Sequence, residues 1–423
     1  MNNSKISNND IAVIGAGISG ISVSKMLIEE GKNVTLFEKN KKIGGLIKCE
    51  RINDNLFHRV GGHVFNSKNK DVLTWFWKYF DKDNEFIRAK RNAQIWLDSE
   101  YIGYPIENFL HKLPENTLKQ VINELLIINQ NTYQEKHKNF EQVLLCTFGR
   151  TLYNLYFEPY NKKIWNCDLS MIPLDWLKGK LPMPDLVSII MSNIYRNEES
   201  EMVHSFFYYP KENGSQFIID RLAEGINIQT DFEIRTLELK SEKWIINGKG
   251  QFDSIVYCGD VRDLYQICKL EDSQKELKSV KDLRSNGTSA MFCETDPTDI
   301  SWLYIPEAKL KAHRIIYTGT FSPDNNKGTN RMTCVVEFSG NQSLELMREE
   351  IKKLPGNLKE IDHNFEPNSY IIHSADTTDL INNLKGKLEP QKLFLLGRFA
   401  EWEYYNMDKA IERAMDVANR ISN

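Results

Sequence analysis

The chain has 423 residues, of which 41% are hydrophobic and 26% are charged, and its net charge is −4. This composition is ordinary for a globular protein, and the length is enough for two or three lobes around sizeable cores. The lack of a basic surplus argues against nucleic acid as a partner, and there is no run of eighteen apolar residues to predict a membrane span. The seven cysteines are scattered and include no Cys-x-x-Cys, which argues against a zinc site or a disulfide framework. We therefore expect a cytoplasmic protein without a metal, a nucleic-acid partner or a membrane partner.

The most specific motif lies in residues 10–38. A short apolar strand precedes Gly15, Gly17 and Gly20, which are spaced as Gly-x-Gly-x-x-Gly, and a helical pattern follows. In such a turn the first glycine closes the bend, the second admits a pyrophosphate to backbone N–H groups, and the third lets the helix pack on the strand. The helix then directs its positive dipole end at the phosphates. The motif therefore predicts a bound dinucleotide.

An acidic residue at the end of the next strand restricts the choice of dinucleotide. Residues 34–37 are apolar and strand-like, and Glu38 follows them. A carboxylate at this position accepts hydrogen bonds from an adenosine ribose and disfavours a 2′-phosphate. We therefore predict FAD or NAD in preference to NADP.

Later segments favour FAD. Gly44-Gly45 follow a basic loop, Gly61-Gly62-His63 interrupt an apolar segment, and Gly397-Arg398 end a strand near the start of a final helix. That helix begins at residues 406–408 and offers a second dipole end, and FAD is long enough to use both. Simple turns and a structural histidine are the alternatives for the glycine pairs and for His63. The predicted cofactor-binding residues are Gly15, Gly17, Ile18, Ser19, Gly20, Glu38, Lys39, Gly44, Gly45, Leu46, Gly61, Gly62, His63, Gly397, Arg398, Asn406, Met407 and Asp408.

In chain order, the pattern predicts an α/β protein with interleaved lobes. A helix is predicted over 71–80, a hairpin over 94–97 and 101–103, a helical block over 113–196, and an amphipathic helix from about Met407. Strands are predicted over 205–209, 226–228, 233–239, 244–246, 252–259, 302–305, 314–318 and 332–338. We expect a Rossmann-type FAD-binding domain assembled from residues 1–85, 205–285 and 390–423. Residues 106–204 form a helical insertion, and residues 86–105 and 286–389 form a β-sheet substrate domain.

These motifs together resemble the UDP-galactopyranose mutase family, more closely its eukaryotic branch, within the amine-oxidase and protoporphyrinogen-oxidase-like flavoproteins. The resemblance rests on IGAGISG, VGGHVF at 60–65, YP at 104–105, PYNKKIW at 159–165, the loop at 176–186, LYIPEAKLKAHR at 303–314 and GRFAEWEY at 397–404. It implies an isomerase in which reduced FAD attacks the anomeric carbon of a nucleotide-sugar through N5 and forms a flavin–sugar adduct. The sugar then recloses between pyranose and furanose forms without net redox change, for cell-surface polysaccharide biosynthesis.

The resemblance also implies a substrate and a reductant, and a second enzyme class of the same fold is the alternative to a mutase. The substrate would be UDP-galactopyranose or a related nucleotide-sugar, and NAD(P)H or a reductase would reduce the flavin. The alternative is an FAD-dependent oxidase or desaturase of the amine-oxidase or protoporphyrinogen-oxidase type, which has the same two-lobe fold. The basic and tyrosine-rich positions favour a phosphate-bearing substrate over the apolar substrates of such enzymes.

The resemblance assigns roles to individual residues. Arg314 matches an arginine that grips the diphosphate, and His63 matches the histidine beside the flavin; with Lys180, these are the predicted catalytic residues. The predicted substrate-binding residues are Tyr104, Glu107, Tyr160, Asn161, Trp165, Lys180, Tyr304, Arg314, Phe321, Tyr370 and Tyr404. Core packing is the alternative for the tyrosines and for Trp165.

Three of these positions depart from the family pattern. Lys180 stands where a second diphosphate arginine is expected, and a lysine cannot form the planar fork. Phe321 replaces a tyrosine and removes one phosphate hydrogen bond, and Glu107 replaces a glutamine near the uracil. We therefore expect the flavin chemistry to persist while the nucleotide or the sugar differs.

Overall fold

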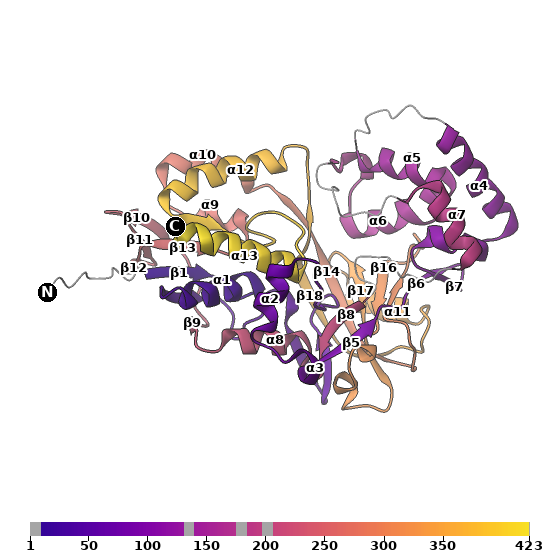
Figure 1. Ribbon diagram of the computed structural model, residues 1–423, viewed down its shortest axis with the longest axis horizontal. Coiled ribbons are helices and arrows are strands. Elements are labelled where there is room, and N and C mark those ends of the chain that lie inside the picture. Colours follow the sequence, from indigo (N-terminus) through magenta and orange to yellow (C-terminus); the bar gives the residue numbers. More distant parts are fainter. Residues whose placement is uncertain (1–9, 131–138, 175–183, 197–205, 423) are drawn as a thin grey trace.

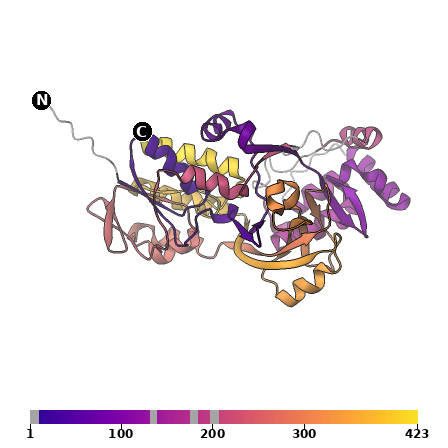
Figure 2. The same cartoon turned by 90° about the horizontal axis from the view of Figure 1, so that it is seen from below.

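The structure is a computed structural model that describes residues 10–130, 139–174, 184–196 and 206–422. Three parts follow one another along the long axis: a parallel sheet with its helices, a second sheet, and a cluster of helices farthest from the C-terminus (Figure 1). The view turned by 90° shows the same order (Figure 2).

The first part is built on a five-stranded parallel sheet. Its strand order is β19 (Leu393–Leu395), β13 (Ser254–Tyr257), β1 (Asp10–Ile14), β2 (Asn33–Phe37) and β9 (Asn227–Gln229). Ile11, Ala12 and Val13 are fully buried, because both faces of this sheet are covered. The strands come from the start, middle and end of the chain, which confirms an α/β fold with a Rossmann-type sheet assembled from discontinuous segments.

Helices and a small sheet cover the two faces. One apolar core contains residues from α1 (Ile18–Glu29), α2 (Lys70–Trp77), α8 (Gly214–Ala223) and α13 (Met407–Ser422). The other contains residues from α9 (Leu264–Ile267), α10 (Gln274–Val280), α12 (Thr377–Leu388) and the sheet of β10 (Leu237–Lys240), β11 (Lys243–Ile246) and β12 (Lys249–Phe252). The predicted helix from about Met407 is confirmed. The strand predicted over 233–239 begins only at Leu237.

The second part is a seven-stranded sheet. Its order is β18 (Lys359–Ile372), β14 (Arg284–Thr295), β17 (Met332–Ser339), β16 (Ala312–Ile316), β15 (Trp302–Tyr304), β6 (Ala93–Leu97) and β7 (Glu100–Gly103). The hairpin of β6 and β7 was predicted, whereas the two longest strands, β14 and β18, were not. The strand predicted over 314–318 ends at Ile316, because a 3₁₀ turn occupies Thr318–Thr320. Helix α11 (Leu344–Ile351) packs against this sheet.

The third part is helical, as the pattern over 113–196 predicted. It comprises α4 (Glu115–Gln130), α5 (Phe140–Leu152), α6 (Glu158–Trp165) and α7 (Leu186–Tyr195), with a π-helical turn between α5 and α6. The remaining elements are the hairpin of β3 (Cys49–Ile52) and β4 (Asn55–His58), helix α3 (Lys82–Glu85), and the pair of β5 (Phe86–Lys90) and β8 (Phe206–Pro210). The predicted domain bounds stay a prediction, since β5 and β8 pair although they were assigned to different domains.

Gly20 tests the packing of α1 on the sheet. A Cβ at this position would lie 2.0 Å from the carbonyl oxygen of Gly15. We expect Gly20→Ala to lower the free energy of unfolding by about 2 kcal/mol or more, because backbone atoms must shift. In the control Gly386→Ala, on an exposed position of α12, the new Cβ meets nothing within 4 Å. This control should gain up to about 1 kcal/mol from helix propensity. Equal urea midpoints for the two variants would contradict the prediction.

Candidate functional site

A cavity of about 830 Å³ begins at the carboxyl ends of β1, β2 and β13 and extends to the seven-stranded sheet. Open α/β sheets bind ligands at such carboxyl ends, where the strand order reverses. Every residue predicted to bind the cofactor lines this cavity: Gly15, Gly17, Ile18, Ser19, Gly20, Glu38, Lys39, Gly44, Gly45, Leu46, Gly61, Gly62, His63, Gly397, Arg398, Asn406, Met407 and Asp408. The fold therefore gathers into one cavity segments that are up to about 390 residues apart in the sequence.

Glycines and Glu38 shape the end of the cavity nearest β1. Gly15 has φ +104° and donates its N–H to the carbonyl of Phe37 at 2.8 Å. A Cβ on Gly45 would lie 3.1 Å from the Cα of Gly17, so Gly45 must be small for the two backbones to approach. The buried Glu38 carboxylate accepts the Ala16 N–H at 2.9 Å, which fixes it beside the turn.

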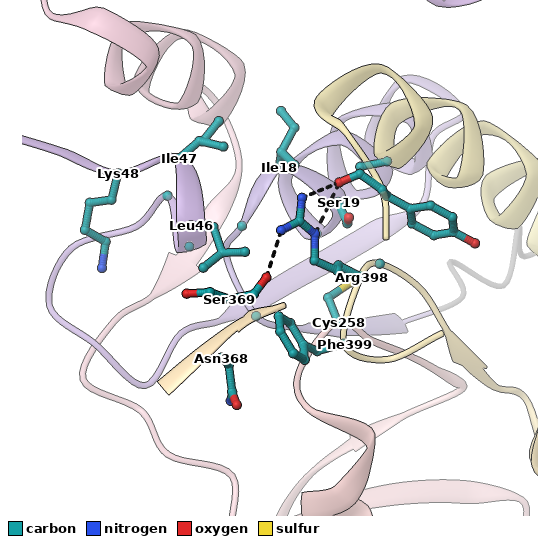
Figure 3. A pocket seen from close by; sticks show the side chains of 18 of the residues that line it. Ile18, Ser19, Leu46, Ile47, Lys48, Cys258, Asn368, Ser369, Arg398 and Phe399 are labelled. Carbon is teal, nitrogen blue, oxygen red and sulfur yellow. Dashed lines mark hydrogen bonds between the residues drawn. The ribbon is translucent and has the colours of Figure 1, made fainter. Parts of the chain in front are cut away.

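Arg398 lies at the far side of the glycine turn (Figure 3). Its guanidinium donates to the carbonyl oxygens of Tyr405 and Ser369 and lies 4.4 Å from the centroid of the Tyr404 ring. Among the residues that the structure describes, no carboxylate forms an ion pair with it. Its positive charge is therefore held by neutral groups and is available to an anionic ligand.

His63 is a neutral side chain on the cavity wall. Its Nε2 atom is buried and has no hydrogen-bond partner among the described residues. Burial, reinforced by the positive charge of nearby groups, lowers the pKa of His63 from 6.5 to about 3. The ring therefore carries no charge near neutral pH.

A buried ion pair joins the backbone next to His63 to Arg314. Glu337, on β17, is fully buried and accepts the N–H of Gly61 at 2.6 Å and Nε of Arg314. Burial alone would raise the pKa of Glu337, but Arg314 and His313 outweigh it and hold the pKa well below its ordinary value. The carboxylate is therefore ionised and fixes Arg314 at the cavity.

Tyrosines line the rest of the cavity end that contains Arg314. Tyr304, Tyr370 and Tyr404 line the cavity with Arg314, and the rings of Tyr370 and Tyr404 are parallel with centroids 6.0 Å apart. Tyr104 and Tyr160 pack against Tyr304 at 4.9 and 5.3 Å. Tyr304, Tyr370 and Tyr404 therefore form an aromatic wall of the cavity, and Tyr104 and Tyr160, which do not line the cavity, lie behind it.

A family model and several known proteins are similar to this chain. A family model described as an NAD(P)-binding Rossmann-like domain matches residues 13–81. UDP-galactopyranose mutase of Mycoplasma genitalium is 23% identical over 97% of this chain and 94% of its own length. The dTDP-fucopyranose mutase of Escherichia coli is 23% identical over 97% of each chain. A crystal structure of reduced UDP-galactopyranose mutase has a TM-score of 0.87 at 20% identity and covers 98% of this chain and 95% of that one.

The chain resembles the UDP-galactopyranose mutases along nearly its whole length. This confirms the resemblance and the fold class expected from the spaced motifs, and the relatives are sugar mutases, which are isomerases. The closer similarity to the eukaryotic branch of this family stays a prediction. In the described part of this mutase-like chain, no helix combines the length and the apolar character needed to cross a bilayer.

Several predicted substrate residues of this mutase-like site lie behind the cavity wall. The ring of Trp165 is 5.8 Å from that of Tyr370, and Asn161 bonds to Trp165 and to the Phe157 carbonyl within α6. Neither residue lines the cavity, so we assign them to the support of the wall. Lys180 lies outside the described residues, and its predicted catalytic role stays a prediction.

Phe321 and Glu107 are not at the cavity either. Phe321 is 1% exposed and packs among Trp302, Phe207 and Tyr209, so its position does not support substrate contact. Glu107 is 4% exposed and likewise absent from the lining. The apolar surroundings that bury these two side chains also keep them from the ligand space.

Two residues at the mutase-like site were not foreseen. Arg91 lines the cavity, donates to the Tyr304 hydroxyl at 2.7 Å, and lies 5.0 Å from the centroid of the Tyr104 ring. Glu337 did carry a signal, since it is the one charged residue in the apolar strand MTCVVEFS.

The environment of Glu107 predicts a pH-dependent cost of folding. Burial raises the pKa of Glu107 from 4.5 to about 7. The unfolded chain releases this proton near pH 4.5 and the folded chain near pH 7, so stability falls as the pH rises through this window. We expect Glu107→Gln to exceed the wild type in unfolding free energy at pH 8, by on the order of 3 kcal/mol, and to match it near pH 4.

Urea denaturation at the two pH values measures this difference. The control is Glu115→Gln, on an exposed carboxylate in the first turn of α4. A gain that is equal at both pH values, or equal in the control, would contradict the assignment to Glu107.

Proposed function

We propose that the protein binds FAD and, with the flavin reduced, interconverts the pyranose and furanose forms of a sugar linked to a nucleoside diphosphate. The observation that carries this proposal is the single cavity, which runs from the glycine turn to Arg314 and the three tyrosines. The relatives named UDP-galactopyranose mutase and dTDP-fucopyranose mutase support a nucleotide-linked sugar as the substrate. Such a reaction would supply cell-surface polysaccharide biosynthesis, and NAD(P)H or a reductase would reduce the flavin.

The residues at the first end of the cavity fit FAD. Gly45, where a Cβ would lie 3.1 Å from Gly17, lets its loop approach the glycine turn, and the N-terminus of α1 lies there, at the expected pyrophosphate position. Glu38 would hold the adenosine ribose, since each carboxylate oxygen can accept more than one hydrogen bond. The buried, unpartnered Nε2 of His63 supports a polar ligand atom beside it.

Arg398 favours the reduced cofactor. The chemistry that a reduced flavin would supply is a nucleophilic ring nitrogen for the anomeric carbon, without net oxidation. Arg398 lies in the same cavity with only carbonyl oxygens as hydrogen-bond acceptors, so its charge stabilises an electron-rich ligand. His63 stays neutral and adds no competing charge.

The end of the cavity that contains Arg314 suits a diphosphate. Arg314 is held by its Nε on Glu337, which directs the guanidinium before the substrate arrives. Tyr304, Tyr370 and Tyr404 offer hydroxyl groups around it, and Arg91 adds a second guanidinium. These groups would bind and orient the departing and returning diphosphate while the aromatic wall excludes water.

Activity with oxidised and reduced protein tests the reaction type. We expect the dithionite-reduced protein to interconvert at least one nucleotide-sugar, with UDP-galactose and dTDP-fucose as the first candidates, and the oxidised protein to do so at less than about one hundredth of that rate. Chromatography of the sugar products is the measurement. Steady hydrogen peroxide formation with an amine or a polycyclic substrate would instead support the oxidase alternative.

Arg314→Lys tests the diphosphate site while keeping a positive charge beside Glu337. A lysine cannot form the planar fork, so we expect the dissociation constant for UDP or dTDP to rise about 10- to 100-fold. The flavin content should stay the same, because Arg314 is not among the residues assigned to the cofactor. The control is Arg348→Lys, on an exposed arginine that pairs with Glu360. Unchanged nucleotide affinity in Arg314→Lys would remove Arg314 from the site.

A further inference from the structure

Lys163 is a half-buried lysine that reaches from helix α6 to the strands that carry two residues of the substrate end. Its Nζ donates to the carbonyl oxygens of Ile305 at 2.8 Å and Ala312 at 3.0 Å. Ile305 directly follows Tyr304 at the end of β15, and Ala312 begins β16 two residues before Arg314. One side chain therefore holds the hairpin at the point where its two strands separate.

The backbone at the C-terminal end of α6 is also hydrogen-bonded to the seven-stranded sheet. The Lys163 carbonyl accepts a hydrogen bond from the Ser339 hydroxyl, at the end of β17. The next carbonyl, that of Ile164, accepts the side-chain amide of Asn286 on β14 at 2.8 Å. The C-terminal turn of α6 is thus fixed to four strands, and Lys163 supplies the link to β15 and β16.

The setting of Lys163 is unusual for a lysine. Among the described residues no carboxylate forms an ion pair with it, and Ile305 and Ala312 are fully buried. Burial lowers the pKa of Lys163 from 10.5 to about 7, and Glu350 and Glu307 offset this only in part. Either protonation state of the amine has two donors for the two carbonyls. An apolar side chain here would instead leave both carbonyl oxygens without this donor in a buried region.

Lys163 joins α6, which carries Tyr160 behind the cavity wall, to the hairpin, which carries Tyr304 on that wall. Tyr160 lies three residues before Lys163 on α6, and its ring is 5.3 Å from that of Tyr304 on the hairpin. Residues three apart on a helix lie on neighbouring positions of its surface, so a shift of Lys163 moves Tyr160 with it. Tyr304 in turn accepts from Arg91 and lies opposite Arg314 in the β15–β16 register.

We propose that Lys163 is a positioning residue, which fixes the β15–β16 hairpin on α6 and thereby the positions of Tyr304 and Arg314 at the nucleotide-sugar site. The expected effect on substrate binding rests on the proposed function. The expected effect on the distance between the rings of Tyr160 and Tyr304 rests on the geometry alone. Loss of the amine should weaken binding of the nucleotide portion, because Tyr304 and Arg314 lose their fixed distance from Tyr160. The flavin end has no contact with this link.

The test compares Lys163→Met with Lys162→Met, whose lysine is next in the chain, more exposed, and paired with Glu158. Isothermal titration with UDP or dTDP, steady-state kinetics of the reduced enzyme and flavin absorbance are measured for both. We expect Lys163→Met to raise the dissociation constant and KM about 10-fold, with kcat within twofold and an unchanged flavin content. Lys162→Met should match the wild type.

A third variant shows whether Lys163 acts as a hydrogen-bond donor or only by filling space. Lys163→Arg keeps N–H donors for the two carbonyls and should recover most of the affinity; it also remains available if Lys163→Met does not fold. A lowered melting temperature with unchanged nucleotide affinity in Lys163→Met would overturn the proposal. So would equal losses in the Met and Arg variants.

Crystal structures of the variants test the geometry without substrate. The rings of Tyr160 and Tyr304 should lie farther apart in Lys163→Met than the 5.3 Å of the wild type. An unchanged separation would overturn the proposal even if affinity fell. If the wild type binds no nucleotide but the rings separate in the variant, the proposed function fails while the role of Lys163 stands.

Discussion

The cavity depends on one buried carboxylate. Glu337 lies in the middle of an apolar strand and has no exposure, so its charge must be compensated inside the protein. Arg314 and the Gly61 N–H provide that compensation from two different parts of the fold. Removing Arg314 would leave the buried carboxylate without its ion pair, which costs several kcal/mol. The position of the loop at residues 60–63 is therefore coupled to the position of the arginine proposed to bind phosphate.

The charges that line the cavity are of both signs. Arg91, Arg314 and Arg398 line it with Lys39 and Lys48, and six carboxylates also line it: Glu38, Glu233, Asp260, Asp263, Glu366 and Asp408. Glu337 offsets part of the Arg314 charge but, being behind it, also fixes its direction. A dinucleotide and a nucleoside diphosphate together bring four phosphates, and the three guanidinium groups in the lining suit phosphate oxygens through paired N–H donors.

The sequence was most informative where function depends on local geometry. Gly15, Gly17, Gly20 and Glu38 could be identified because a turn, a close backbone approach and a strand end each demand a particular residue type. The strands β14 and β18 were missed for a physical reason. Much of β18 is exposed or half-buried and carries a proline, so it lacks the apolar alternation by which a strand is recognised.

Long-range contacts within the site could not be read from spacing. Arg91 and Glu337 meet their partners only after β15, β16 and β17 have paired, and nothing local to either residue reveals this. For Phe321 and Glu107, a match to a family position does not say whether a side chain reaches the cavity. Both are buried and absent from the lining, and their roles at the substrate stay predictions.

A second buried carboxylate repeats the arrangement of Glu337 on the other side of the cavity. Glu401 accepts the N–H of Gly397 at 3.1 Å and is balanced by Lys385 and Arg413. Gly397 and Gly61 both have positive φ, so each stands in a conformation that other residues rarely adopt. In each case a buried carboxylate fixes a glycine near His63 or Arg398; the cations paired with Glu401 do not line the cavity, whereas Arg314, paired with Glu337, does. The backbone around the proposed flavin position is thus held by ion pairs that lie behind it, and these need no ligand to form.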